Sequence, residues 1–124
     1  MNSHRKTAFA LAWMALIFIL SSIPGSHTGP EGDIFDVIKK ILHFCIFGVL
    51  AYAYFNAFGR ARYFFGRPRA VLVLSFVLTV LYAISDEYHQ LFTPGRNASP
   101  YDVMIDSAGA AVFLAVLNVK KRAK

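Results

Sequence analysis

Residues 70–96 decide the fold, and they read AVLVLSFVLTVLYAIS followed by DEYHQLFTPGR. The first part carries no charge, and nothing before Pro94 breaks a helix, so we predict one helix over 70–92. That length suffices to cross a bilayer, which takes about 20 helical residues. The polar second part then lies at one end of the span. Because ionisable groups at membrane depth are costly, they usually mark a pathway or a site.

Three further apolar blocks of similar length lie at 7–23, 41–58 and 102–119. Hydrophobic residues make up 56% of the 124-residue chain and the mean hydropathy is +0.48. Soluble domains are only about 45–50% apolar. The blocks also leave little sequence for a soluble domain. We therefore predict an all-α, polytopic membrane protein whose single domain, residues 1–124, is a compact bundle of four transmembrane helices.

The first block has an alternative interpretation. Arg5 and Lys6 precede an apolar run that ends in SSIPGS, an arrangement that resembles a cleavable signal peptide. The run is longer than the apolar region of a typical signal peptide, and no A-x-A cleavage pattern follows it. We expect this block to be a retained helix.

The charges are distributed unevenly across the predicted membrane. If the N-terminus is cytoplasmic and the chain crosses four times, ten of the 13 Lys and Arg residues lie on the cytoplasmic side. Only Lys39, Lys40 and Arg96 lie outside, whereas all seven Asp and Glu residues lie on or near the outer side. Cytoplasmic loops are enriched in Lys and Arg. We therefore predict cytoplasmic N- and C-termini, and we attribute the net charge of +6 to the membrane surface and not to nucleic acid.

Polar residues recur at helical spacing near the outer ends of three predicted helices. Residues three or four apart share a helix face. The three stripes are Asp86 with His89 and Gln90, Asp102 with Asp106 and Gly109, and Asp36 with Lys39 or Lys40 and His43. We expect them to converge on one cavity that opens to the extracytoplasmic side.

Two local signals concern the fourth helix. Pro100 suits a helix start and Ser99 suits the capping position before it. Gly109 lies among small residues, at 107–111, which predict a close approach of two helices.

Several segments resemble the VanZ-like family of bacterial membrane proteins. They are SSIPG at 21–25, KILHF at 40–44, SDEYHQLFTPGR at 85–96, SPYD at 99–102 and Gly109, in the family's order and spacing. The resemblance implies a small multi-pass protein of the bacterial inner membrane. The founding member of that family is associated with resistance to the glycopeptide antibiotic teicoplanin. Two positions depart from the family: Asp106 stands where Asn is common, and Phe113 where a small residue is common.

Binding is the first of three functions that these residues leave open. A polar pocket at the outer face would hold a lipid-linked or cell-envelope ligand that bears phosphate or carboxylate. The planar guanidinium of Arg96 suits such groups. The other candidate binding residues are Lys40, His43, Gln90, Asp102 and Asp106.

Catalysis is the second function that these residues leave open. Asp86, Glu87 and His89 are candidate general acids and bases for a membrane-embedded hydrolase or transferase acting on an envelope substrate. A divalent metal is a further option, with Asp86, His89 and Asp106 as its candidate ligands and with Asp102 and His43 able to complete a hard-ligand site. Arg96 nearby would oppose a cation unless it pairs with an acid.

The third possible function is a purely structural role, because buried polar groups need hydrogen-bond or ion-pair partners in any case. Arg96 would then form an ion pair with Asp86, Glu87 or Asp102 and pin the outer loop over the bundle. His89 and Gln90 would form hydrogen bonds across helices.

Overall fold

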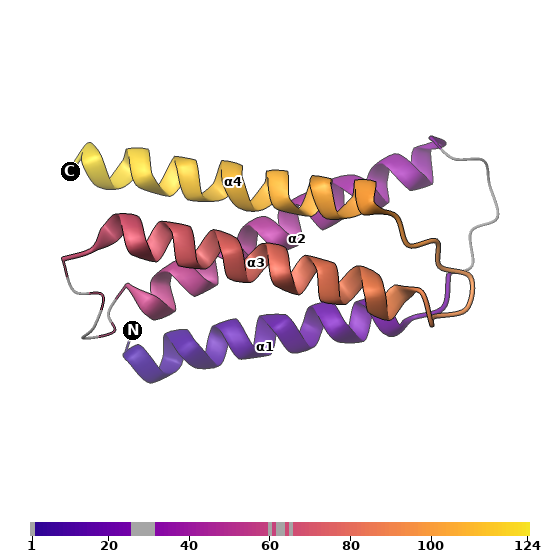
Figure 1. Ribbon diagram of the computed structural model, residues 1–124, viewed down its shortest axis with the longest axis horizontal. Coiled ribbons are helices and arrows are strands. Elements are labelled where there is room, and N and C mark those ends of the chain that lie inside the picture. The colour runs from indigo at the N-terminus through magenta and orange to yellow at the C-terminus, as the bar shows by residue number, and fades with distance from the viewer. Residues whose placement is uncertain (1, 26–31, 60, 62–63, 65) are drawn as a thin grey trace.

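The computed structural model describes residues 2–25, 32–59, 61, 64 and 66–124. Within them the chain forms four α-helices and no strand. The helices are α1 (Ser3–Ser22), α2 (Ile34–Phe58), α3 (Pro68–Gln90) and α4 (Pro100–Arg122). Figure 1 shows an up-and-down bundle whose two chain ends lie at the same end. The predicted all-α bundle of four helices is confirmed.

The helix ends agree closely with the sequence. The side chain of Ser99 accepts a hydrogen bond from the backbone N–H of Tyr101 at 3.2 Å, which confirms the predicted cap before Pro100. Asp33 caps α2 in the same way, accepting from the N–H of Asp36 at 2.9 Å. Glu31, Arg60 and Arg62, which contribute to the predicted charge asymmetry, lie outside the described ranges.

Three helices, α1, α3 and α4, are long and apolar enough to cross a membrane. Their outer faces expose large apolar side chains, including Leu11, Ile19, Val73, Leu81, Met104 and Val119. Exposed apolar surface on this scale indicates contact with lipid, and helices satisfy their backbone polar groups internally, as a bilayer requires. We conclude that the chain is a membrane protein. The span over 41–58 in α2 stays a prediction.

Helix α2 lies at the centre of the bundle and packs against each of the other three helices, most extensively against α4. One side of it contributes Phe47 and Leu50 to a core shared with α1 and α3, where they join Ile17 and Ala83. Its other side contributes Phe55 to a second core, shared with α3 and α4. Burial on both sides fixes the rotation of α2 and therefore the directions in which its polar residues point.

Helices α2 and α4 approach each other closely at Gly109. A Cβ atom there would overlap the backbone carbonyl of Phe44, so the predicted role of this small residue in close packing is confirmed. Phe113, which stands where a small residue was expected, packs against a glycine of α2. A Cβ atom on Gly48 would overlap the Phe113 ring. Gly109 therefore meets the backbone of α2, and Gly48 meets a ring of α4. His43 directly precedes Phe44 and Asp106 lies one turn before Gly109, so both are held near this contact.

Candidate functional site

The loop after α3 docks onto the end of α1, which joins two of the motifs far apart in the sequence. The N–H of Gly25 donates to the carbonyl of Pro94 at 3.0 Å. A Cβ atom on either Gly25 or Gly95 would overlap the carbonyl of the other, and Gly95 has a φ of +72°, which favours glycine. The SSIPG and TPGR segments are therefore two halves of one backbone contact.

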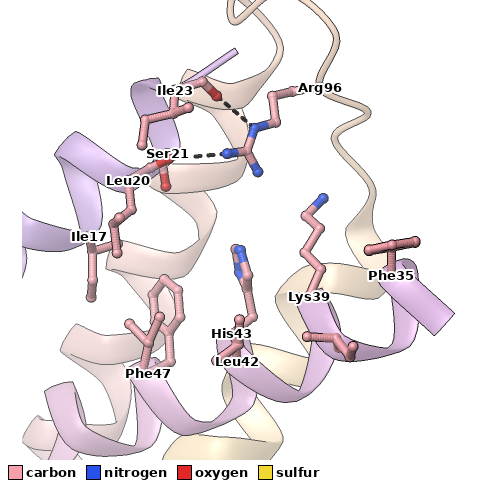
Figure 2. A pocket seen from close by; sticks show the side chains of 12 residues that line it. Ile17, Leu20, Ser21, Ile23, Phe35, Lys39, Leu42, His43, Phe47 and Arg96 are labelled. Carbon is pink, nitrogen blue, oxygen red and sulfur yellow. Dashed lines mark hydrogen bonds between the residues drawn. The ribbon is translucent and has the colours of Figure 1, made fainter. Parts of the chain in front are cut away.

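Arg96 holds this contact from the loop side. Its Nε donates to the carbonyl of Ile23 at 3.0 Å, and its Nη2 donates to that of Leu20 at 3.1 Å (Figure 2). Carbonyls at the end of a helix lack the usual intrahelical partner, and the Leu20 carbonyl accepts from the Ile23 N–H as well as from Arg96. The loop is pinned to the bundle, but through backbone carbonyls of α1 and not through the acids that we had considered as ion-pair partners.

A groove of about 340 Å³ lies between α1 and α2, directly below Arg96 (Figure 2). Binding sites for small molecules commonly have volumes of about 300–1,000 Å³ and mainly apolar walls. The polar residues that line this groove are Lys39, His43, Arg96 and Ser21. Its apolar wall includes Ile17, Leu20, Ile23, Ile38, Leu42 and Phe47. The groove therefore combines an apolar wall with the two permanent positive charges of Lys39 and Arg96.

The two adjacent lysines of α2 have different surroundings. Lys39 lines the groove, and its ammonium makes no ion pair with any acid in the described residues. Lys40 lies on another side of α2, where its Nζ is 2.6 Å from Asp36 and 5.6 Å from the centre of the Tyr101 ring. The hydrogen bond from Lys40, together with one from the Gly32 N–H, lowers the pKa of Asp36 below its ordinary value. The structure thus places Lys39 in the groove and the predicted residue Lys40 outside it.

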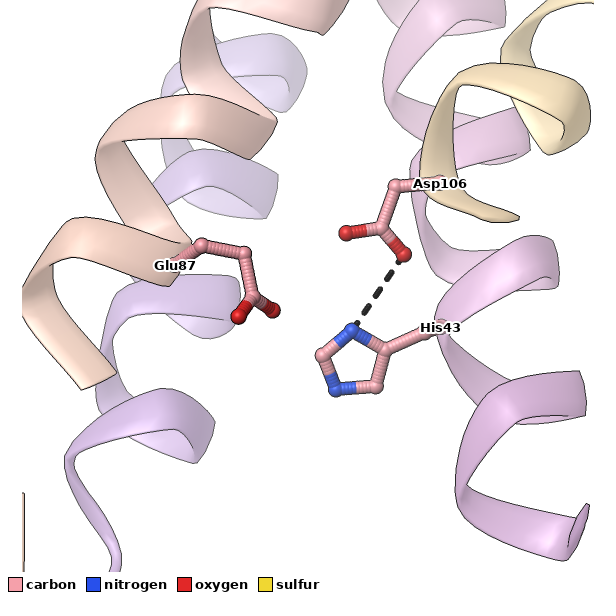
Figure 3. Close-up of side chains that lie close together, drawn as sticks. All are labelled: His43, Glu87 and Asp106. Atoms are coloured by element: carbon pink, nitrogen blue, oxygen red, sulfur yellow. Dashed lines mark ion pairs between the residues drawn. The ribbon is translucent and has the colours of Figure 1, made fainter. Parts of the chain in front are cut away.

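Behind the groove, three helices bring His43, Glu87 and Asp106 together; we call this group the carboxylate–histidine cluster (Figure 3). One donor atom from each residue lies within 4.8 Å of the other two. The Nδ1 of His43 is 3.3 Å from Oδ1 of Asp106, an ion-pair distance when the ring is protonated, although the two atoms lack hydrogen-bond geometry. Glu87 uses one oxygen to accept from the Ser99 N–H at 3.1 Å.

The remaining polar residues of α3 contact α1 and one another. Gln90 is fully buried and its Nε2 lies 3.2 Å from Asp86 and 3.4 Å from the hydroxyl of Ser21. His89 faces another way, with Nε2 3.0 Å from the hydroxyl of Ser22 and its ring stacked on Phe18.

The predicted residues therefore separate into three groups. His43, Glu87 and Asp106 form the cluster, and Arg96 joins His43 at the groove. Asp86 and Gln90 form a buried pair that reaches α1. The other three predicted residues, His89, Lys40 and the half-buried Asp102, belong to none of the groove, the cluster and this pair.

Two residues that line the groove were not among the candidate site residues: Ser21, and Lys39, which was considered only as the alternative to Lys40 in the polar stripe of this helix. A signal for Lys39 is present in the sequence. Asp36 and Lys40 are four apart, so on a helix they pair with each other and leave Lys39 as the cation without a local partner. Ser21 has no such signal, because its place in the site depends on how α1 packs.

A comparison of the sequence with protein families assigns the chain to a known family. The model of a family described as VanZ/LLP1 matches residues 6–121, nearly the whole chain. Comparisons with curated proteins and with solved structures gave no match.

Proposed function

This chain belongs to the VanZ/LLP1 family, and we propose that it binds an anionic, lipid-linked ligand of the cell envelope in the groove between α1 and α2. In this proposal the protein lies in the bacterial inner membrane with both termini in the cytoplasm, so the groove opens on the extracytoplasmic side. The association of the family with glycopeptide resistance supports an envelope ligand, because glycopeptides act outside the cytoplasmic membrane.

The observation that carries the proposal is the presence of two cationic side chains in an otherwise mainly apolar groove. Lys39 and Arg96 both line it, and the groove wall is formed largely by apolar side chains of α1 and α2 (Figure 2). A free lipid-facing cavity would need no permanent charge, and charges at such a position are costly without a counterion. A phosphate or carboxylate head group supplies that counterion, while its chain covers the apolar wall.

The donors of Arg96 are sufficient for both roles. A guanidinium has five N–H groups in a planar fork, and two of its nitrogens donate to the carbonyls of Ile23 and Leu20. The other N–H groups are available to a ligand. Arg96 thus positions the loop and also presents charge to the groove.

The experiment compares two matched variants, Lys39→Gln and Lys40→Gln. Each removes one positive charge from adjacent residues of α2, but only Lys39 lines the groove. The protein is extracted from bacterial membranes in a mild detergent, and native mass spectrometry identifies the lipids that it retains. We expect wild type and Lys40→Gln to retain one anionic lipid, and Lys39→Gln to bind it about tenfold more weakly, the effect of losing about 1.4 kcal/mol of charge–charge interaction.

Equal retention by both variants would contradict the proposal, as would retention of zwitterionic lipids alone by the wild-type protein. The mass of the retained lipid also identifies the ligand, which the groove alone does not do. Arg96 is a poorer test residue, because removing it also breaks the two bonds to α1.

Acid–base catalysis on the same ligand is the second candidate, and the carboxylate–histidine cluster favours it. Glu87 and Asp106 are buried beside His43, an arrangement that suits proton transfer. If a bond of the ligand is cleaved or formed, Glu87→Gln should accumulate an unreacted ligand whose mass differs from that retained by wild type. Identical masses would exclude the catalytic alternative and leave binding in place.

A further inference from the structure

The carboxylate–histidine cluster contains buried oxygens that nothing in the described part of the protein satisfies. Asp106 is 0% exposed; its Oδ1 lies 3.3 Å from Nδ1 of His43 without hydrogen-bond geometry, and its Oδ2 has no hydrogen-bond partner among the described residues. Glu87 is 6% exposed, and its Oε1 has no hydrogen-bond partner either. Buried carboxylate oxygens without partners cost several kcal/mol, and native proteins rarely retain them without a reason.

The charges around the cluster are also unbalanced. Asp86, Glu87 and Asp106 are all buried at this end of the bundle, and the imidazole of His43 is the basic group that they surround. Two permanent cations, Lys39 and Arg96, line the groove beside His43 without being members of the cluster, and Lys40 is paired with Asp36. Within the cluster itself, two buried carboxyl groups face one imidazole, and a divalent cation would supply the counter-charge that they lack.

The geometry fits a metal ion. The donor atoms of His43, Glu87 and Asp106 come from α2, α3 and α4 and point toward one another (Figure 3). All three atoms lie within 4.8 Å of one another. Three donor atoms on one Zn²⁺ or Mn²⁺ ion are about 3.0–3.6 Å apart, so the set would contract by about 1 Å when an ion binds.

We propose that His43, Glu87 and Asp106 bind one divalent transition-metal cation of the Zn²⁺ or Mn²⁺ type. One imidazole nitrogen with two carboxylate oxygens is a donor set that suits these ions better than Ca²⁺ or Mg²⁺, which prefer oxygen alone. Three protein ligands leave coordination positions open for water or substrate. The ligand set differs from the predicted one, because Asp86 pairs with Gln90 and His89 contacts α1.

This inference does not rest on the proposed lipid ligand. The cation site lies within the α2–α3–α4 side of the bundle, whereas the groove lies between α1 and α2. His43 belongs to both, so a bound cation lies beside the groove. A failure to bind metal would leave the groove and its lipid test unchanged.

The test measures metal binding directly. Untagged protein in detergent is stripped with a chelator, exchanged into metal-free buffer and titrated with ZnCl₂ and with MnCl₂ by isothermal calorimetry. We expect one equivalent to bind to wild type and the affinity of Asp106→Asn to fall by about 100-fold or more, beyond the 10–100-fold typical of residues that only orient ligands. Asp102→Asn is the matched control, since it removes an acid one turn earlier on α4 and outside the cluster, and its affinity should stay within twofold of wild type.

Two results would overturn the proposal: no saturable binding to wild type up to about 1 mM metal, or equal affinities for wild type and Asp106→Asn. A spectroscopic measurement covers the case in which Asp106→Asn does not fold. Electron spin echo spectra of Mn²⁺ bound to wild-type protein should show coupling to an imidazole ¹⁴N, and His43→Asn should lose it. Absence of that coupling in the wild-type protein would also refute the ligand set.

Discussion

Replacing Gly109 with alanine tests whether the contact between α2 and α4 holds the site together. The added Cβ atom would overlap the carbonyl of Phe44, which belongs to a helix backbone and cannot rotate away. Relieving that overlap requires the helices to separate by about 1 Å. Overpacking of this kind costs about 3 kcal/mol at the upper end of its range, and the better helix propensity of alanine returns about 1 kcal/mol. We expect a net destabilisation of about 2 kcal/mol.

The same separation should disturb the site. His43 precedes Phe44 and Asp106 lies one turn before Gly109, so moving the helices apart lengthens the 3.3 Å distance between His43 and Asp106. Equilibrium unfolding in mixed micelles, titrated with SDS, measures the stability. Ala108→Leu is the control, because this exposed neighbour adds bulk without an overlap, and its effect should be below about 0.5 kcal/mol. A Gly109→Ala protein as stable as wild type would refute the reasoning.

Three further predictions follow from the loop, the ion pair and the topology. Gly95→Ala and Gly66→Ala each force a positive φ on alanine, which costs about 1–2 kcal/mol. Only at Gly95 does the added Cβ atom also overlap backbone, so the unfolding free energy of Gly95→Ala should fall further than that of Gly66→Ala. Equal losses in the two variants would contradict the docking of the loop on α1. The pKa of Asp36 is lowered from its ordinary value of 3.8, so its ion pair with Lys40 stabilises the fold above that pH and is lost as the pH falls through the lowered pKa. In Lys40→Met, carbon-13 NMR should show the pKa of Asp36 rising toward 3.8. An unchanged titration would contradict the ion pair. In a background without the native cysteine, Asn97→Cys should react with a membrane-impermeant maleimide in intact cells, and labelling only after lysis would reverse the orientation.

The four-helix fold could be predicted because its signals are local. Apolar blocks of spanning length, a Ser–Pro start at α4 and the small residue Gly109 each act through neighbouring residues or through one general packing rule. The structure has the four helices, the Ser–Pro start and the close approach at Gly109, and of the described helices α1, α3 and α4 are long and apolar enough to span a membrane.

The site could be predicted only in part, because its composition depends on how helices rotate against one another. Helical spacing alone groups His89 with Asp86, yet the packing of α3 turns His89 to Ser22 of α1 and turns Glu87 into the cluster. The three cluster members come from three helices, and no spacing within one helix relates them. Arg96 shows the same limit, since its partners are backbone carbonyls that carry no sequence signal.

The most direct test of the lipid-binding groove is to locate a bound anionic lipid on the protein. A phosphatidic acid with a diazirine in its acyl chain is added to purified protein, crosslinked by light, and the modified peptides are identified by mass spectrometry. The groove predicts adducts concentrated on residues such as Leu20 and Leu42, and a loss of these adducts in Lys39→Gln but not in Lys40→Gln. Adducts spread evenly over exposed apolar residues such as Val73 and Val112, and equal in both variants, would contradict it.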